Sequence, residues 1–279
     1  DRSFLKLSPD VAIISSMDPD HLDIYGDGDS VLESFQLFVN QIKSDGFFIQ
    51  KKGLTLSSNL GGSTFGIDQG EFQAHNIRIE DHRMIFDMSY PGGEVKDIPM
   101  RIPGFHNIEN ALAAAALAMQ VGVSGEEIKA GIASFLGVKR RFEYQVESDE
   151  HVMIDDYAHH PTEIAACLNS VKALYPGVKI TAVFQPHLFS RTRDFIDDFA
   201  KSLAIADELY LLDIYPAREL PIEGVTSDWL LNKIELKEKQ VISKKDLIRV
   251  IDEKKPALLV TMGAGDIDLL LNDLKLSLS

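Results

Sequence analysis

Apolar and polar residues follow strand-like and helix-like patterns in the first half of the chain. Apolar runs at residues 11–15 and 47–49 predict buried strands. Residues 31–42 predict an amphipathic helix, because Val31, Phe35, Phe38, Val39 and Ile42 fall on one stripe. From residue 54 to 102, short apolar segments are broken by Gly, Asn and Asp, which favours an antiparallel meander. Residues 110–121 and 125–135 predict two further helices.

Beyond Gly137 the pattern changes to repeated strand, loop and helix. Strands are predicted at residues 152–156, 180–184, 208–212 and 258–262, and helices at 161–174, 193–204 and from 267 onwards. This alternation favours a mostly parallel sheet with helices on both faces, an α/β fold of Rossmann-like type. We therefore predict two domains, residues 1–137 and 138–279.

Four polar loops follow directly on the predicted strands of the second domain. They span residues 155–163, 185–192, 213–219 and 263–266 and carry His, Arg, carboxylate and glycine residues. Because ligands of open α/β sheets bind outside the carboxyl ends of the strands, these loops predict a polar site at one edge.

Several of these residues also have purely structural interpretations. Glu163 follows His160 by three residues and is as readily a helix cap as a functional carboxylate. Arg193 is better explained as a solvated residue at a helix start. The Gly263–Gly265 turn either packs a strand against a helix or receives an anion at a helix N-terminus.

Three further groups stand in or near the first domain. His21 lies among Asp18, Asp20 and Asp23, which form either a solvated turn or an oxygen-rich magnesium site. Asn107 and Asn110 share one helix face and either cap the helix or bind a base edge. The basic residues 139–141 are either a linker or a site for phosphoryl oxygens.

Composition limits the classes of partner. The formal charge of −15 argues against nucleic acid, whose phosphates select basic surfaces. The single cysteine, Cys167, allows no internal disulfide and favours a reducing, cytoplasmic compartment. No apolar run approaches the roughly 20 residues of a membrane span, and no signal peptide is visible. Because Asp1 replaces an initiator Met, we expect the chain to be an inner part of a longer protein.

Five motifs together resemble the Mur ligases, in the order found in that family. They are residues 15–26 (SSMDPDHLDIYG), 106–111 (HNIENA), 140–143 (RRFE), 155–163 (DDYAHHPTE) and 185–193 (QPHLFSRTR). The last two are most similar to the members that join L-alanine to UDP-N-acetylmuramate. The resemblance implies a partial central ATP-binding domain followed by a Rossmann-like amino-acid-binding domain.

The resemblance also implies a reaction. ATP phosphorylates the substrate carboxylate, the amine of L-alanine attacks the acyl phosphate, and phosphate leaves as the amide forms in peptidoglycan synthesis. Such chemistry needs positioning and charge neutralisation.

The family's residue roles transfer to matching positions in this chain. His21 would help to hold Mg²⁺, and Arg141 would approach the γ-phosphate of ATP. The adenine and ribose of ATP would contact His106, Asn107, Asn110 and Asp156. The muramate carboxyl or the amino acid would face Tyr157, His159, His160, His187, Ser190 and Arg191, with Arg191 on the alanine carboxylate because a guanidinium pairs with it bidentately.

The chain departs from the family pattern in one large respect. It contains no Gly-Lys-Ser or Gly-Lys-Thr sequence, the loop that cradles ATP phosphates. We therefore expect the 279 residues alone not to catalyse ligation and to bind ATP weakly.

Other functions remain as alternatives. A related ligase that attaches a recycled tripeptide to the same sugar shares much of the second histidine motif. A nucleotide-binding oxidoreductase would fit the α/β pattern but lacks Gly-x-Gly-x-x-Gly after a first strand. A binding module without catalysis is the third alternative.

Overall fold

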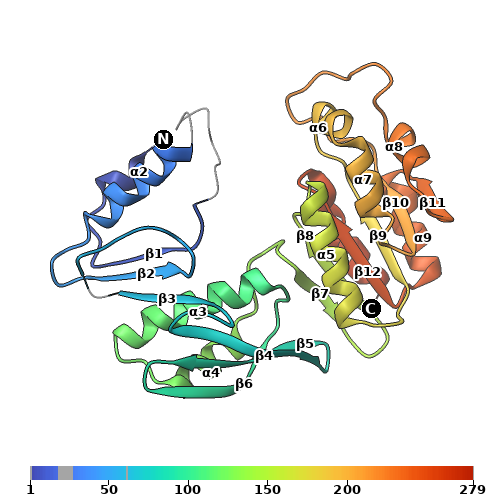
Figure 1. Ribbon diagram of the computed structural model, residues 1–279. Helices are drawn as coiled ribbons and strands as arrows, with labels where there is room; N and C mark the ends of the chain where they lie inside the picture. The colour runs from blue at the N-terminus through green and yellow to red at the C-terminus, as the bar shows by residue number, and fades with distance from the viewer. Residues whose placement is uncertain (1, 18–27, 61, 279) are drawn as a thin grey trace. The chain divides into compact units, whose positions relative to one another are not determined.

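The chain forms two compact units, each with its own sheet and hydrophobic core (Figure 1). The structure is a computed structural model that describes residues 2–17, 28–60 and 62–278. Unit 1 comprises Asp1–Phe135 and unit 2 comprises Leu136–Ser279.

Unit 1 is built on a six-stranded sheet in the order β1-β2-β3-β4-β5-β6. The pairs from β1 to β4 are parallel, and those from β4 to β6 are antiparallel. Its strands are β1 (Val11–Ile14), β2 (Phe47–Lys51), β3 (Gly62–Ile67), β4 (Phe72–Glu80), β5 (Arg83–Tyr90) and β6 (Gly93–Met100). Its helices are η1 (Ser3–Lys6), α2 (Gly28–Val39), α3 (Phe105–Gln120) and α4 (Gly125–Ser134).

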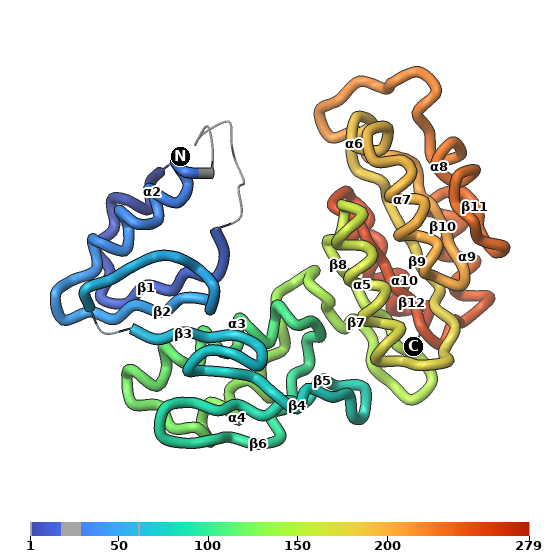
Figure 2. Tube along the Cα trace, viewed as in Figure 1, coloured from blue at the N-terminus to red at the C-terminus, as the bar shows by residue number. Residues whose placement is uncertain are grey.

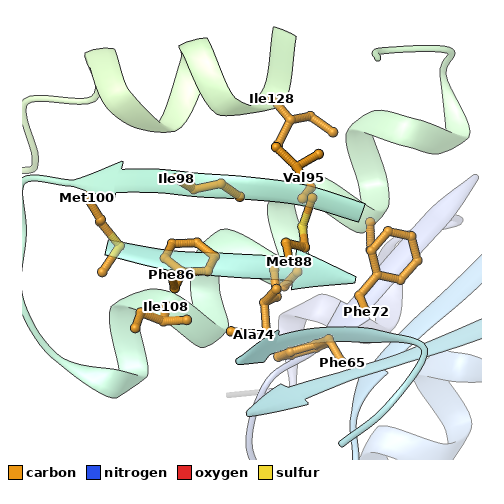
Figure 3. Close-up of a cluster of buried hydrophobic side chains, with 14 of the residues drawn as sticks. Phe65, Phe72, Ala74, Phe86, Met88, Val95, Ile98, Met100, Ile108 and Ile128 are labelled. Carbon is orange, nitrogen blue, oxygen red and sulfur yellow. The ribbon is translucent and has the colours of Figure 1, made fainter. Parts of the chain in front are cut away.

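The core of unit 1 lies between the sheet and helices α3 and α4. Phe65, Phe86 and Met88 are fully buried from the strands and meet Ile108 and Ile128 from the helices (Figure 3). The small side chains of Ala113, Ala115 and Ala116 allow α3 to approach the strands closely. The Ala-rich helix predicted at 110–121 begins earlier, at Phe105, so His106, Asn107 and Asn110 all belong to its first two turns.

Unit 2 contains a six-stranded sheet in the order β11-β10-β9-β12-β8-β7. All pairs are parallel except β7 with β8. Its strands are β7 (Glu143–Glu147), β8 (Val152–Asp156), β9 (Ile180–Phe184), β10 (Glu208–Leu211), β11 (Glu238–Val241) and β12 (Leu258–Met262). Its helices are α5 (Pro161–Leu174), α6 (Phe189–Asp194), α7 (Ile196–Leu203), α8 (Ser227–Lys233), α9 (Lys244–Lys254), η2 (Asp266–Leu270) and α10 (Leu271–Ser277).

Both faces of this sheet are covered by helices, as predicted. Val183 packs into the cluster formed with α9 and α10, whereas the next residue, Phe184, contacts Phe199 of α7. Successive side chains of a strand point to opposite faces, so an unbroken apolar strand such as β9 needs cover on both sides. Cys167 is buried in α5, in agreement with its interpretation as a helix residue, and burial raises the pKa of its thiol.

Some elements differ from the sequence predictions. Strand β3 is parallel to both neighbours, so the antiparallel meander holds only for β4 to β6, because a strand's own residues do not encode its partner's direction. Helix α2 ends at Val39, although Ile42 is still buried through the turn that follows. The helix predicted at 193–204 is instead two helices, α6 and α7, that meet at Phe195.

Candidate active site

The predicted polar loops emerge together at the carboxyl edge of the unit 2 sheet. Asp156, Phe184 and Met262, the last residues of β8, β9 and β12, are aligned across the sheet, and Leu211 of β10 pairs with Phe184. The loops after these four strands therefore leave the sheet at the same level. This confirms that they share one edge.

Strand β8 ends with two carboxylates whose hydrogen bonds differ. Asp155 is fully buried and accepts bonds from Thr261 Oγ1 at 2.6 Å and Arg140 Nε at 3.1 Å. The carboxylate of Asp156 accepts backbone N–H bonds from Phe142 and Ala158, both at 2.8 Å. Burial raises the pKa of both groups, and the hydrogen bonds oppose that shift. Each Asp156 oxygen keeps a second lone pair for a ligand hydroxyl.

Arg140 fastens the segment before β7 to this edge. Besides Asp155, its guanidinium donates to the Gly263 carbonyl at 2.5 Å and lies 5.1 Å from the centroid of the Tyr157 ring. Arg140 is thereby engaged in structure, whereas the neighbouring Arg141 is exposed. Of the two, Arg141 is the guanidinium that remains available to a phosphate.

His159 and His160 are held by a helix cap. Glu163 Oε2 accepts the backbone N–H groups of His159 at 2.9 Å and His160 at 3.1 Å, which confirms the capping interpretation of Glu163. His159 Nδ1 lies 2.9 Å from the Tyr157 carbonyl, which only accepts, so this nitrogen carries the hydrogen. In the neutral ring, His159 Nε2 is then the free acceptor. His160 Nδ1 accepts from Thr162 N at 3.4 Å and its ring packs on Phe195.

The loop after β9 brings His187 and Arg191 to the same place. The rings of His159 and His187 lie 6.1 Å apart, and Arg191 Nη1 is 3.5 Å from His187 Nδ1. Because a guanidinium only donates, Nδ1 of His187 is the acceptor and the ring is neutral. Burial, together with the charges of Arg191 and His159, lowers the pKa of His187. Two imidazoles and one guanidinium thus converge, and we call them the His159–His187–Arg191 cluster.

Two residues of the loop after β10 complete the surroundings of the cluster. Tyr215 stacks on His187, with ring centroids 5.7 Å apart and an interplanar angle of 18°. Glu219 accepts the backbone N–H of Ser190 at 3.0 Å and also its hydroxyl hydrogen. These bonds to Ser190 lower the pKa of Glu219. The sequence identified this loop as part of the edge but gave neither residue a role, since only the fold brings the two loops together.

Arg193 and Gly263 of unit 2 both have structural roles. Arg193 pairs with its exposed neighbour Asp194, in agreement with a solvated helix residue. Gly263 has φ +143°, and a Cβ there would lie 2.8 Å from the Gln185 carbonyl oxygen. The turn at Gly263 therefore serves a close approach between loops. The helix predicted from Ile267 is present: it begins as the five-residue 3-10 helix η2 and continues as α10.

The candidate nucleotide residues of unit 1 lie at the start of α3. His106 and Asn110 are exposed, and Asn107 Nδ2 donates to the Pro103 carbonyl at 2.7 Å. Gly104 has φ +112°, and a Cβ there would lie 2.7 Å from the His106 ring, so glycine lets this ring fold over the backbone. No side chain caps α3. Neither asparagine therefore acts as the N-cap.

His21 and the acidic residues around it lie outside the described residues, so the predicted magnesium site has no structural account. Within residues 2–17, 28–60 and 62–278, no group of three or more His, Cys, Asp or Glu side chains is arranged to hold a metal ion. In the same parts of the chain, no helix combines the length and apolar character needed to cross a membrane.

Comparison with known families matches both units. The Mur ligase middle domain profile matches residues 2–118, and the profile described as "Mur ligase, glutamate ligase domain" matches residues 140–265. The chain belongs to the Mur ligase family. The expected fold class, a Mur ligase middle domain followed by a Rossmann-like α/β domain, is thereby confirmed.

Two named relatives are similar to this Mur ligase chain over most of its length. It is 51% identical over 268 residues to UDP-N-acetylmuramate–L-alanine ligase of Christiangramia forsetii, covering 96% of this chain and 58% of that protein. It is also 51% identical to the enzyme of the same name from Flavobacterium psychrophilum, covering 96% and 59%. The chain therefore spans less than two thirds of the length of these relatives.

Two solved structures of ligases are also similar to this chain. The UDP-N-acetylmuramate-alanine ligase of Thermotoga maritima superposes with a TM-score of 0.78 at 27% identity, over 98% of this chain and 60% of that one. A murein peptide ligase from Psychrobacter arcticus gives a TM-score of 0.53 at 25% identity over 98% of this chain and 59% of that one.

Proposed function

We propose that the gene product joins L-alanine to UDP-N-acetylmuramate in an ATP-dependent reaction of cytoplasmic peptidoglycan synthesis. The observation that carries the proposal is the 51% identity, across 96% of this chain, to proteins named for that reaction. The His159–His187–Arg191 cluster supports it, because it sets a guanidinium, a group that pairs with carboxylates, beside two imidazoles.

The reaction proceeds through an acyl phosphate. The muramate carboxylate attacks the γ-phosphorus of ATP, and ADP leaves. The free amine of L-alanine then attacks the activated carbonyl, and the tetrahedral intermediate collapses with loss of phosphate and a proton. The protein's contribution is to align the groups and to neutralise developing charge.

Arg191 is proposed to bind the alanine carboxylate. Its guanidinium offers parallel donors that fit a carboxylate, and its contact with His187 sets its place. An amino group bound next to it would face the two imidazoles. His159 Nε2 is proposed to accept a hydrogen from that amine, since His159 Nδ1 already donates to the Tyr157 carbonyl. Tyr157, His160 and Ser190 are assigned to the wall of the same site.

Nucleotide-binding roles are proposed residue by residue, at the positions that match the family's motifs. Arg141, exposed and unlike Arg140 not tied to the sheet edge, is assigned to the γ-phosphate. Asp156 is assigned to the ribose hydroxyls. The adenine region is assigned to His106, Asn107 and Asn110. Mg²⁺, with His21 among its ligands, would neutralise phosphate charge.

A comparison of acceptors tests the proposal. The full-length gene product is incubated with ATP and UDP-N-acetylmuramate, and either L-alanine or the tripeptide L-alanyl-γ-D-glutamyl-diaminopimelate is added. We expect ADP release and amide product with L-alanine and not with the tripeptide. Preference for the tripeptide would replace this proposal with the recycling ligase.

A second assay concerns the chain by itself. Because the 279 residues contain no Gly-Lys-Ser/Thr loop for the ATP phosphates, we expect no ligation when they are assayed alone. ATP-dependent amide formation by these residues would contradict this expectation.

A further inference from the structure

A cavity of about 430 Å³ lies at the same sheet edge as the His159–His187–Arg191 cluster. Its walls come from the end of β9, the loop after β10, the start of α9 and Asp266. None of the three cluster side chains lines it. Tyr215 lines the cavity and also stacks on His187, so its ring stands between the cluster and the empty space.

The backbone of Tyr215 is fixed on both sides. Its N–H donates to the Pro186 carbonyl at 2.8 Å, and its carbonyl accepts from Leu188 N at 2.9 Å. The base of the side chain packs against Gly265, where an added Cβ would come within 2.8 Å of Tyr215 Cβ and Cγ. These contacts fix the backbone and the base of the Tyr215 side chain, and its ring lies against His187.

We propose that Tyr215 determines specificity for the acceptor amino acid, because its ring keeps the side chain of that amino acid out of this cavity. The inference rests on the proposed function. The guanidinium assigned to the carboxylate lies 3.5 Å from His187, and Tyr215 is the ring stacked on that imidazole. An acceptor side chain longer than a methyl group, directed to this side, meets the Tyr215 ring before it reaches the cavity.

The chemistry of the cavity indicates which acceptors it would take once opened. Its wall combines the apolar residues Leu212, Ile214 and Ile242 with Asp213. Lys244 is paired with Asp266 there, so its ammonium charge is already balanced and the Asp213 carboxylate remains as an acceptor. Such a surface suits a side chain with an apolar stem and a hydrogen-bond-donating end, and L-glutamine is the probe of that class.

A second cavity provides a matched control. It measures about 350 Å³ and is lined by Phe195, whose ring packs on His160. His160 is committed to the cap of α5 through its Nδ1, whereas His187 contacts Arg191 directly. Removing the Phe195 ring therefore enlarges a cavity of similar size that none of the three cluster residues lines.

The test compares Tyr215→Ala, Tyr215→Phe and Phe195→Ala in the full-length gene product. The kcat/KM is measured for L-alanine, L-norvaline and L-glutamine, and calorimetry confirms that each variant is folded. We expect Tyr215→Ala to raise the glutamine-to-alanine ratio of kcat/KM at least tenfold. Tyr215→Phe, which keeps the ring, and Phe195→Ala should leave the ratio unchanged. If Tyr215→Ala does not fold, Tyr215→Leu is measured in its place.

Each outcome has a distinct meaning. An unchanged ratio in a folded Tyr215 variant, or an equal rise with Phe195→Ala, overturns the assignment of Tyr215 while leaving alanine ligation intact. Failure of the unsubstituted enzyme to ligate L-alanine overturns the proposed function, and the assignment of Tyr215 with it.

Discussion

At the scale of single residues, the direction of each hydrogen bond decides which side-chain atoms remain free to bind a ligand. Arg140 and Arg141 are neighbours in the sequence, but the guanidinium of Arg140 already donates hydrogen bonds to Asp155 and Gly263. His159 and His187 both use Nδ1, but this nitrogen donates to a carbonyl in His159 and accepts from a guanidinium in His187. The sequence identifies the residue types, and only the contacts show which atoms remain free.

Arg191 gives the most direct prediction at this scale. Arg191→Lys keeps the charge but loses the paired donors, so kcat/KM for L-alanine should fall. Hydrogen bonds to charged groups contribute about 1.5–3 kcal/mol, which corresponds to a loss of roughly 10- to 100-fold. Steady-state kinetics of the full-length enzyme measure this. The matched control is Arg193→Lys, which affects only the exposed pair with Asp194; similar kinetics for both variants would exclude the assignment.

His187 gives a prediction about pH. Its pKa in the folded chain lies below the ordinary value of 6.5, so the unfolded chain binds the proton more readily. The stability from this group is complete above about pH 6.5 and is lost as the pH falls through the lowered pKa. His187→Gln should therefore make the free energy of unfolding less dependent on pH between about 5 and 7. Urea denaturation at several pH values measures it, with exposed His106→Gln as the control.

At the scale of elements, the site is assembled from loops that follow parallel strands. The sequence predicted this arrangement well because buried parallel strands are unbroken apolar runs, as β8, β9 and β12 show. It missed β11 and α9, whose residues are partly exposed and mixed in polarity. It also joined α6 to α7, since no Gly or Pro marks the break at Phe195.

Glu219 links two of these elements. Its carboxylate holds Ser190 in the first turn of α6, the helix that also carries Arg191, and Figure 2 shows the long connection between β10 and α8 from which it comes. In Glu219→Ala, the backbone amides of residues 190–194 should exchange hydrogen faster, and KM for L-alanine should rise. Glu219→Gln retains one acceptor oxygen, so its exchange rates and its KM for L-alanine should lie between those of Glu219→Ala and those of the unsubstituted enzyme. Unchanged exchange in Glu219→Ala would contradict a positioning role.

Gly263 gives a prediction for the close approach of two loops. A Cβ on this residue meets the Gln185 carbonyl oxygen at 2.8 Å, and its φ of +143° is strained for any other residue. Gly263→Ala should lower the free energy of unfolding by about 1–3 kcal/mol. Gly131→Ala is the contrast, because it lies inside α4 with nothing within 4 Å of the added Cβ. It should stabilise the chain by about 0.5–1 kcal/mol. Urea denaturation of both variants provides the comparison.

At the scale of the whole molecule, each unit has a six-stranded sheet and a hydrophobic core of its own. The polar residues that form the candidate site in unit 2 make their described contacts within residues 140–266. We therefore expect residues 136–279, expressed alone, to fold cooperatively. Circular dichroism and a dispersed NMR spectrum would show it, and a spectrum typical of a random coil would contradict it.

The hydrogen bonds on either side of Arg141 limit its backbone freedom. Arg141 N donates to the Val138 carbonyl at 3.0 Å, and the next residue, Phe142, donates from its backbone N–H to Asp156 at 2.8 Å. Directly before this turn, Gly137 has φ +98°, a conformation that glycine adopts without a steric cost. Rotation of the backbone ahead of Val138 therefore leaves Arg141 attached to the edge of the unit 2 sheet.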